Sequence, residues 1–430
     1  MINRIFIGQF LAVFLFCSAQ LCAEDILTQL HKHLPNATIE ETKAGDYFKR
    51  EFTIMLSQNI DHKDPAVGQF QQRIFLSHYD VNAPNVIVTE GYSARPRYYE
   101  LSQILKANQI QVEYRFFGES IPENKDYRYL KNDHAAADLH QIRKQLSKIY
   151  KGKWAATGIS KGGTTTLIYK SKYPKDVTVA IPIVGPLPKA REDKRCDDHI
   201  LSIGTKNCRD NIEAFQHKVL GLRKLFLTKI DSLATQNNLT YQTLSIPAAF
   251  EYAVLEFSFS FWQFGHDCNR LDRDMTDHQT FVLFNEIVGI DFFSDAVIDY
   301  FKPSYFQFMT ENGYYGFIHK PFVPELKVVN DYTNMVFSPE AKSIPFDRNY
   351  MISVRNWIYQ YGDKIIHIHG GLDPWGALRD PIHPKRDAHM IIDENGDHST
   401  RISTLDMHQK ELIYKVLAQW MDCDIFPLEK

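Results

Sequence analysis

The chain reads Lys-Trp-Ala-Ala-Thr-Gly-Ile-Ser-Lys-Gly-Gly-Thr over residues 153–164, an apolar run that ends in G-x-S-x-G. This pattern is typical of a nucleophile elbow, in which a strand stops abruptly and a serine occupies a strained turn before a helix. Small residues flank that serine because the strand and the helix approach each other closely. The motif therefore predicts that the Ser160 hydroxyl projects from the edge of a sheet. The glycines are not followed by Lys-Ser or Lys-Thr, which excludes a phosphate-binding P-loop.

Segments around the motif alternate between apolar strands and amphipathic helices. Apolar runs at 85–92, 110–116 and 177–184 are typical of parallel strands that are buried on both faces. Residues 133–150 carry apolar side chains at helical spacing and lead into the elbow. This alternation predicts a parallel sheet with right-handed crossovers. Together with the elbow, it indicates an α/β-hydrolase fold, with a mostly parallel sheet and an inserted helical cap domain.

The strand pattern is interrupted once, which divides the chain after its N-terminal segment into three parts. Residues 24–187 are expected to form the first part of the α/β-hydrolase domain, and residues 363–430 its second part. Between them, helical periodicity replaces the strands over residues 188–362, the predicted cap domain. Within the cap, the apolar spacing predicts one long helix over 212–230. A cap above an active site must present apolar side chains to the substrate, and the aromatic candidates are Phe257, Phe259, Phe261 and Trp262.

The N-terminus has the features of a secretory signal peptide. Arg4 precedes a short apolar run over residues 5–16, and the predicted cleavage site follows Ala23, although Leu21 is bulkier than the small residue usual at that position. The apolar run is too short to span a membrane. We therefore expect residues 1–23 to be a signal peptide and the protein to be secreted or periplasmic, without a membrane span.

The amino-acid composition limits the kinds of molecule that this protein is expected to bind. The chain has 430 residues, of which 44% are hydrophobic and 23% are charged, as in an ordinary globular protein. The formal net charge is -3 and there are no long basic runs, which argues against nucleic acid as a partner. Small or peptidic substrates fit this composition better.

Four of the six cysteines lie outside the predicted signal peptide. An even number in an exported chain indicates disulfide bonds, and four cysteines allow three connectivities. Cys196 and Cys208 bracket a short polar segment and are the first-choice pair, with Cys268 and Cys423 remaining. Their spacing does not match a zinc site, so no metal is expected.

The acid and the base are sought after the late strands, because the α/β-hydrolase triad runs Ser, Asp or Glu, then His along the chain. Asp373 follows an apolar run at 364–369, and His398 lies in the loop after another short run. We predict a catalytic triad of Ser160, Asp373 and His398. The alternatives for the acid are Asp393 and Asp397, and those for the base are His383, His389 and His408.

Two backbone N–H groups are expected to form the oxyanion hole. The residue after the nucleophile supplies one donor in this fold, which is Lys161 here. The second donor arises after an earlier strand, where Gly91 follows the apolar run at 85–90.

Several segments of the chain resemble the secreted bacterial prolyl tripeptidyl and tetrapeptidyl aminopeptidases, serine peptidases related to the lysosomal Pro-Xaa carboxypeptidase. The likeness covers most of the chain, and Ser-Lys-Gly-Gly at the elbow is similar to the aminopeptidase branch. The matching segments are QNIDH (58–62), FQQR (70–73), EYRFFGES (113–120), GISKGG (158–163), FEYAVLE (250–256), FWQ (261–263), GLDPWGA (371–377) and GDH (396–398).

The resemblance implies cleavage after proline near a free peptide N-terminus, with the predicted triad, a helical cap and no metal or organic cofactor. Pocket acids would then pair with the substrate ammonium, and the candidates are Glu90, Glu251 and Glu256. Each of these acids also fits a structural ion pair. Two other functions remain open on the residues alone: a lipase or esterase on the same scaffold, and a catalytically silent binding protein.

Overall fold

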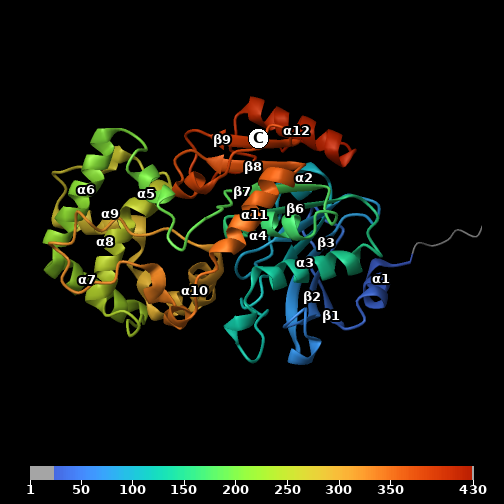
Figure 1. Cartoon of the computed structure of the whole chain (residues 1–430), viewed down its shortest axis with the longest axis horizontal. Coiled ribbons are helices and arrows are strands. Elements are labelled where there is room, and N and C mark those ends of the chain that lie inside the picture. Colours follow the sequence, from blue (N-terminus) through green and yellow to red (C-terminus); the bar gives the residue numbers. More distant parts are fainter. Residues whose placement is uncertain (1–23, 429–430) are drawn as a thin grey trace, which may run out of the picture.

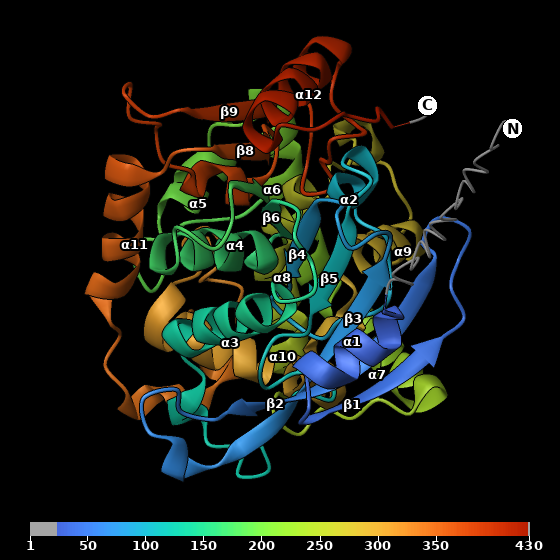
Figure 2. The same ribbon diagram turned by 90° about the vertical axis from the view of Figure 1, so that its right-hand side faces the viewer.

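A computed structural model describes residues 24–428, so the predicted signal peptide lies outside the described residues. Nine strands form one sheet in the order β1-β2-β3-β5-β4-β6-β7-β8-β9 (Figure 2). The first three strands run antiparallel to their neighbours, and β4 to β9 are parallel to one another. The strands are β1 (Ala37–Thr42), β2 (Arg50–Asn59), β3 (Gln69–His78), β4 (Asn85–Thr89), β5 (Asn108–Val112), β6 (Trp154–Ile159), β7 (Val179–Ile183), β8 (Ile365–Gly370) and β9 (Ala388–Asp393).

The sheet is covered on both faces, which explains why β4, β5, β7 and β8 are buried along their whole length. In β4, Val86 and Val88 face one hydrophobic cluster and Ile87 faces another. The first cluster includes residues of α2 (Glu100–Ile104) and α12 (Met407–Met421). The opposite face is covered by α1 (Ile26–His33), α3 (Asn132–Leu146), α4 (Lys161–Lys172) and α11 (Arg348–Tyr361). This is the predicted α/β-hydrolase fold, with β1 and α1 as elements that the sequence analysis did not identify.

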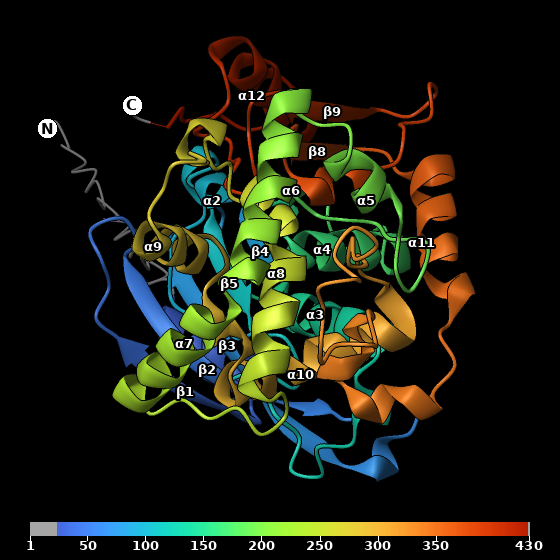
Figure 3. The same ribbon diagram turned by 90° about the vertical axis from the view of Figure 1, so that its left-hand side faces the viewer.

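The helical cap lies to one side of the sheet and is built around α8 (Ile246–Gln263) (Figures 1 and 3). Every residue of α8 from Ala249 to Trp262 is buried, because neighbouring helices surround it. These neighbours are α5 (Arg195–Ile200), α6 (Lys206–Gly221), α7 (Arg223–Asn237), α9 (Asp277–Val288) and α10 (Asp295–Gln307).

The prediction of one continuous helix over 212–230 is wrong, because the chain breaks at Leu222 into α6 and α7. Both helices pack their apolar sides into the cluster around α8, so the helical spacing continues across the break. The spacing of apolar residues shows which side chains are buried. It does not show that a helix is interrupted by a single residue, because the spacing is the same on both sides of the break.

Helix α11 falls within the range predicted for the cap but packs against the sheet domain. Met351, Val354 and Ile358 contact Leu167 and Ile168 of α4 in one hydrophobic cluster. The chain has therefore already returned to the α/β-hydrolase core before β8 begins.

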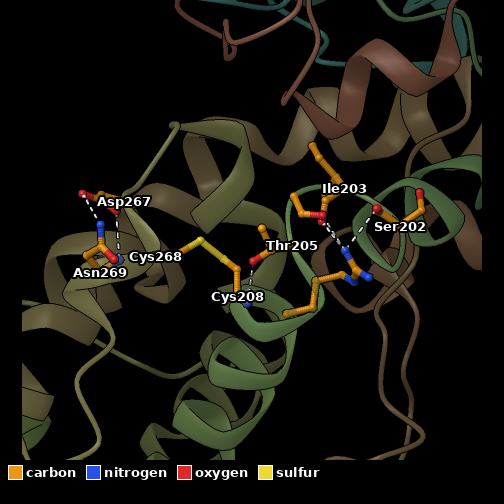
Figure 4. The surroundings of a disulfide bond; sticks show 9 residues. Ser202, Ile203, Thr205, Cys208, Asp267, Cys268 and Asn269 are labelled. Atoms are coloured by element: carbon orange, nitrogen blue, oxygen red, sulfur yellow. Dashed lines mark hydrogen bonds between the residues drawn. A yellow bond between two sulfur atoms is a disulfide. The ribbon is translucent and has the colours of Figure 1, made fainter.

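The disulfide bond joins Cys208 to Cys268, so the first-choice pair Cys196–Cys208 is wrong (Figure 4). It links the first turn of α6 to the segment after α8, across 60 residues of sequence. Cys196 is buried in α5 and directs its thiol toward the Pro374 carbonyl, at 3.5 Å. Helix packing brought a distant cysteine to Cys208 in place of the one nearest in sequence. Within residues 24–428, no helix has the length and apolarity that a membrane crossing needs.

Candidate active site

Ser160 occupies a strained turn between β6 and α4, with φ 57° and ψ -125°. Few residues other than glycine adopt such a positive φ, and such strain is concentrated at functional sites. The flanking glycines allow the close approach that the turn requires. A Cβ atom at Gly158 would lie 2.4 Å from the Gly162 carbonyl oxygen, and one at Gly163 would lie 2.9 Å from Gly185 Cα. The geometry is therefore that of the predicted nucleophile elbow.

Asp373 and His398 meet at the same edge of the sheet. The His398 Nδ1 and Asp373 Oδ2 atoms are 2.6 Å apart, and Asp373 Oδ1 accepts a hydrogen bond from the Trp375 N–H. Asp373 is fully buried, so this carboxylate is shielded from water. A carboxylate bonded to Nδ1 leaves Nε2 of the imidazole available to accept a proton from a serine.

The contact between Asp373 and His398 follows from the sheet topology. Strands β8 and β9 are adjacent and parallel, so the loops after them emerge at one edge. The Leu372 N–H donates to the Gly396 carbonyl at 2.8 Å and joins these two loops. The alternative acid Asp397 instead accepts from the Ser399 N–H at 2.6 Å, within its own loop.

Ser160 and His398 line one cavity of about 1100 Å³ between the sheet edge and the cap. In the part of the chain that the structure describes, the Ser160 hydroxyl has no hydrogen-bond partner. Catalytic hydrogen bonds are often long in uncomplexed enzymes and tighten when substrate binds. Ser160 and His398 therefore face the same cavity, and Asp373 is bonded to His398 behind it.

The two predicted oxyanion donors are also neighbours of Ser160. Lys161 begins α4, where backbone N–H groups have no acceptor within the helix. A Cβ atom at Gly91 would lie 2.6 Å from Lys161 Cβ, so the two backbone segments are in contact. The Lys161 side chain is buried with Nζ 3.5 Å from the centre of the Tyr114 ring, and burial lowers the pKa of its ammonium group well below the usual value. The ammonium group of Lys161 thus lies against Tyr114, and the predicted oxyanion donor of this residue is its backbone N–H.

The cap contacts the loop that carries His398. The His398 N–H donates to the Gln263 carbonyl, the last residue of α8, at 2.9 Å. Gly265 follows in the left-handed region at φ +62°, and a Cβ atom there would lie 2.4 Å from Asp397 Oδ2. The end of α8 therefore determines where the loop around His398 can lie.

Gly265→Ala is expected to lower kcat by about 100-fold, because the added methyl group displaces Asp397 and with it the adjacent His398. Steady-state kinetics and thermal unfolding test this expectation together. Gly221→Ala is the matched control, since a Cβ atom at Gly221 meets nothing within 4 Å. A destabilised Gly265→Ala enzyme with unchanged kcat would show that α8 does not position His398.

The four predicted substrate-binding residues occupy different environments. Glu90 and Glu256 line the cavity that contains Ser160 and His398. Glu251 does not: its fully buried carboxylate pairs with Arg223 at 2.7 Å and accepts from the N–H groups of residues 327–329. Trp262 faces a separate cavity on the other side of α8 and does not line the Ser160 cavity. The structure therefore brings Glu90 and Glu256 to the site and leaves Glu251 and Trp262 away from it.

Glu90 and Glu256 differ in how their charges are balanced. Glu90 accepts hydrogen bonds from Tyr99 Oη at 2.5 Å and Gln111 Nε2 at 2.8 Å, and Arg97 lies 3.5 Å away. Glu256 is bonded only to the hydroxyls of Ser260, at 3.1 Å, and Tyr315, at 2.7 Å. Burial raises the pKa of Glu256 to about 7 against the lowering effect of these hydrogen bonds. Glu256 is thus a buried acid without a basic partner among the described residues.

A smaller pocket adjoins Ser160 and has mostly aromatic and proline walls. Its walls include Tyr92, Pro186, Phe308, Tyr314 and Trp375. A single π-helical turn, Phe308–Asn312, follows α10, and its first and last residues line this pocket. Such turns are frequent at functional sites.

None of these pocket aromatics was selected from the sequence. The residues chosen there, Phe257, Phe259 and Phe261, are buried in the cap core and do not line either cavity around Ser160. Two signals in the sequence point to them: Trp375 lies two residues after Asp373, and Tyr92 follows Gly91, a predicted oxyanion donor.

The chain is similar in sequence to a known family of peptidases and to individual members of related families. The model of a family described as PS-10 peptidase S37 matches residues 19–425. The chain is 29% identical over 401 residues to prolyl tri/tetrapeptidyl aminopeptidase of Streptomyces mobaraensis, covering 89% of this chain and 82% of that protein. It is 24% identical over 161 residues to lysosomal Pro-X carboxypeptidase of Mus musculus, covering 32% and 33% of the two chains. The solved structure of a proline iminopeptidase from Mycobacterium smegmatis aligns with 85% of this chain and 97% of its own, at 13% identity and a TM-score of 0.38.

Proposed function

Because the chain belongs to the PS-10 peptidase S37 family of serine peptidases, we propose that it is an exported enzyme that releases short N-terminal peptides by cleavage after proline. One observation carries this proposal: Ser160, His398 and the unpaired acid Glu256 line a single cavity. The predicted signal peptide and the Cys208–Cys268 disulfide support export, since disulfides persist in oxidising compartments.

The proposed reaction proceeds through an acyl-enzyme. His398 takes the proton of the Ser160 hydroxyl as the serine attacks the carbonyl carbon of the proline, and it then gives that proton to the amine of the following residue, which leaves. Asp373 holds the imidazole tautomer and stabilises the imidazolium. The N–H groups of Lys161 and Gly91 stabilise the oxyanion, an effect of about 3 kcal/mol per donor. Water then attacks the ester with His398 again as the base, and the N-terminal peptide leaves.

The small aromatic pocket beside Ser160 supports a preference for proline. A pyrrolidine ring is compact and apolar, and it has no N–H group that would need a partner inside such a pocket. Tyr92, Phe308, Tyr314 and Trp375 supply the flat surfaces against which the ring packs. Their proximity to Ser160 would place the proline carbonyl at the nucleophile.

Glu256 supports recognition of a free N-terminus. Its carboxylate is buried, lines the cavity and has only hydroxyl partners. A substrate ammonium would therefore supply the positive charge that the protein does not. An ion pair in so desolvated a position discriminates strongly against an acylated N-terminus.

Glu256→Gln is expected to reduce kcat/KM for a peptide with a free N-terminus by about 100-fold, because the substrate ammonium then loses its buried counter-charge. In the unmodified enzyme, kcat/KM for this peptide should rise with pH through about 7 as Glu256 ionises. It should fall again above about 8, where the peptide amine loses its proton. The variant should lack the contribution of Glu256 to the rising limb. An N-acylated peptide is the control, and an equal effect of Glu256→Gln on both peptides would contradict this role.

A three-substrate panel tests the proposed function. We expect hydrolysis of Ala-Ala-Pro-nitroanilide, much slower hydrolysis of its N-acylated form, and no preference for a short nitrophenyl ester. Equal rates on the free and acylated peptides would refute the aminopeptidase proposal. A preference for the ester would favour a lipase or esterase, and no turnover of any substrate would favour a silent binding protein.

A further inference from the structure

The cavity wall carries a pair of arginines that the proposed reaction does not use. Arg95 and Arg97 line the same cavity as Ser160 and His398. They lie in the segment between β4 and α2, shortly after the oxyanion residue Gly91. Both are exposed at the surface, and 52% of the Arg97 side chain is accessible. The cavity thus contains an unpaired buried acid, Glu256, and also a basic region near solvent.

Arg97 is held in place but retains free donors. Its Nε donates to Tyr99 Oη at 3.0 Å, and its guanidinium carbon lies 4.6 Å from the centre of the Tyr99 ring. The nearest acid, Glu90, is 3.5 Å from Nη2 and already accepts from Tyr99 and Gln111. A guanidinium has five N–H donors, so the Nη1 edge of Arg97 remains available to a ligand.

Arg95 has a fixed backbone and an unpaired side chain. Its carbonyl accepts a hydrogen bond from Gln111 Nε2 at 3.0 Å, which anchors this part of the loop to β5. Among residues 24–428, no carboxylate forms an ion pair with the Arg95 guanidinium. The Arg97 guanidinium is fixed against Tyr99, and the Arg95 guanidinium has no ion-pair partner among the described residues. Two arginines of this kind, separated by one residue, form a site suited to an exposed carboxylate.

The segment that carries the two arginines is joined through Glu100 to the part of the chain that follows His398. Glu100 accepts hydrogen bonds from the N–H groups of Ile402, at 2.8 Å, and Ser403, at 3.2 Å. The segment that contains Arg97 is therefore adjacent to the loop that carries His398. In the proposed reaction His398 protonates the leaving amine, so a leaving peptide that extends along this loop reaches the two arginines.

Resting on the proposed function, we propose that Arg95 and Arg97 bind the C-terminal carboxylate of the leaving peptide. The preferred substrates are then short oligopeptides with both ends free, which extend only a few residues beyond the proline. The N-terminal ammonium lies at Glu256 and the C-terminal carboxylate at the arginines. Glu256, Ser160 and both arginines line this one cavity of about 1100 Å³, which is large enough for such a peptide.

Paired peptides that differ only at the C-terminus provide the test. Ala-Ala-Pro-Ala-Ala with a free carboxylate and the same peptide as an amide are compared by kcat/KM, with released peptides quantified chromatographically. We expect the acid to be cleaved about fivefold better than the amide, a ratio that decreases with added salt. In Arg95→Gln and in the double variant Arg95→Gln/Arg97→Gln, this ratio should approach one.

Arg128→Gln is the matched control, because Arg128 is an exposed arginine that pairs with Asp126 and lines none of the cavities around Ser160. It should keep the fivefold ratio. Hydrolysis of Ala-Ala-Pro-nitroanilide shows that each variant is folded and active, since that substrate has no C-terminal carboxylate. Equal cleavage of acid and amide by the unmodified enzyme, or a ratio unaltered in the arginine variants, would overturn the carboxylate site. Absence of nitroanilide turnover would instead refute the proposed function.

Discussion

Ser160→Ala is expected to lower kcat for Ala-Ala-Pro-nitroanilide by about 10⁶-fold and to abolish covalent labelling by a fluorophosphonate. Alanine removes the oxygen that forms both the acyl-enzyme and the phosphonyl adduct. The residual rate would come from substrate binding and from the N–H groups of Lys161 and Gly91. Titration with the fluorophosphonate measures the fraction of reactive serine, and stopped assays at high enzyme concentration measure the residual rate.

Ser202→Ala is a suitable control for this experiment. Ser202 is exposed, and its hydroxyl donates only to the carbonyls of Asp198 and His199. Its labelling and kcat should equal those of the unmodified enzyme. Labelling that persists in Ser160→Ala would mean that another residue is the nucleophile, and the elbow would then have no catalytic role.

Asp373→Asn is expected to lower kcat by about 10⁴-fold with a small effect on KM. The asparagine has nearly the same shape, but its amide group would stabilise the wrong imidazole tautomer and leave the imidazolium without a counter-charge. Fluorophosphonate labelling should slow in parallel, because it also requires His398 to activate Ser160. Thermal unfolding of the variant checks that the loss is not a loss of folded protein.

The variant Asp397→Asn tests which of the two acids near His398, Asp373 or Asp397, is the acid of the triad. Asp397 bonds to Ser399 in its own loop, whereas Asp373 bonds to the imidazole. We expect the loss of kcat in Asp397→Asn to be at least about 100-fold smaller than in Asp373→Asn. Comparable losses in the two variants would contradict the assignment of Asp373 as the acid of the triad.

Local patterns were sufficient to predict the parallel part of the sheet and the elbow, although not strand β1. A run such as Asn85–Thr89 is apolar because both faces of that strand are covered, and Gly158 and Gly162 are small because strand and helix nearly touch. The order of Ser160, Asp373 and His398 along the chain then followed from the order of the strands. The strands and the elbow are visible in sequence because each depends on residues a few positions apart, and the order of the triad residues depends only on the order of those strands.

Contacts between distant segments could not be read in the same way. Cys208 bonds to Cys268, and not to nearby Cys196, because the helices around α8 bring those two residues together. Glu251 and Glu256 are five residues apart on α8, yet one pairs with Arg223 and the other opens into the cavity. Burial alone does not reveal which neighbour a side chain meets, since that neighbour comes from another part of the chain. The identities of the strands and the elbow were therefore encoded locally, while the partners of each buried acid and thiol were decided by packing.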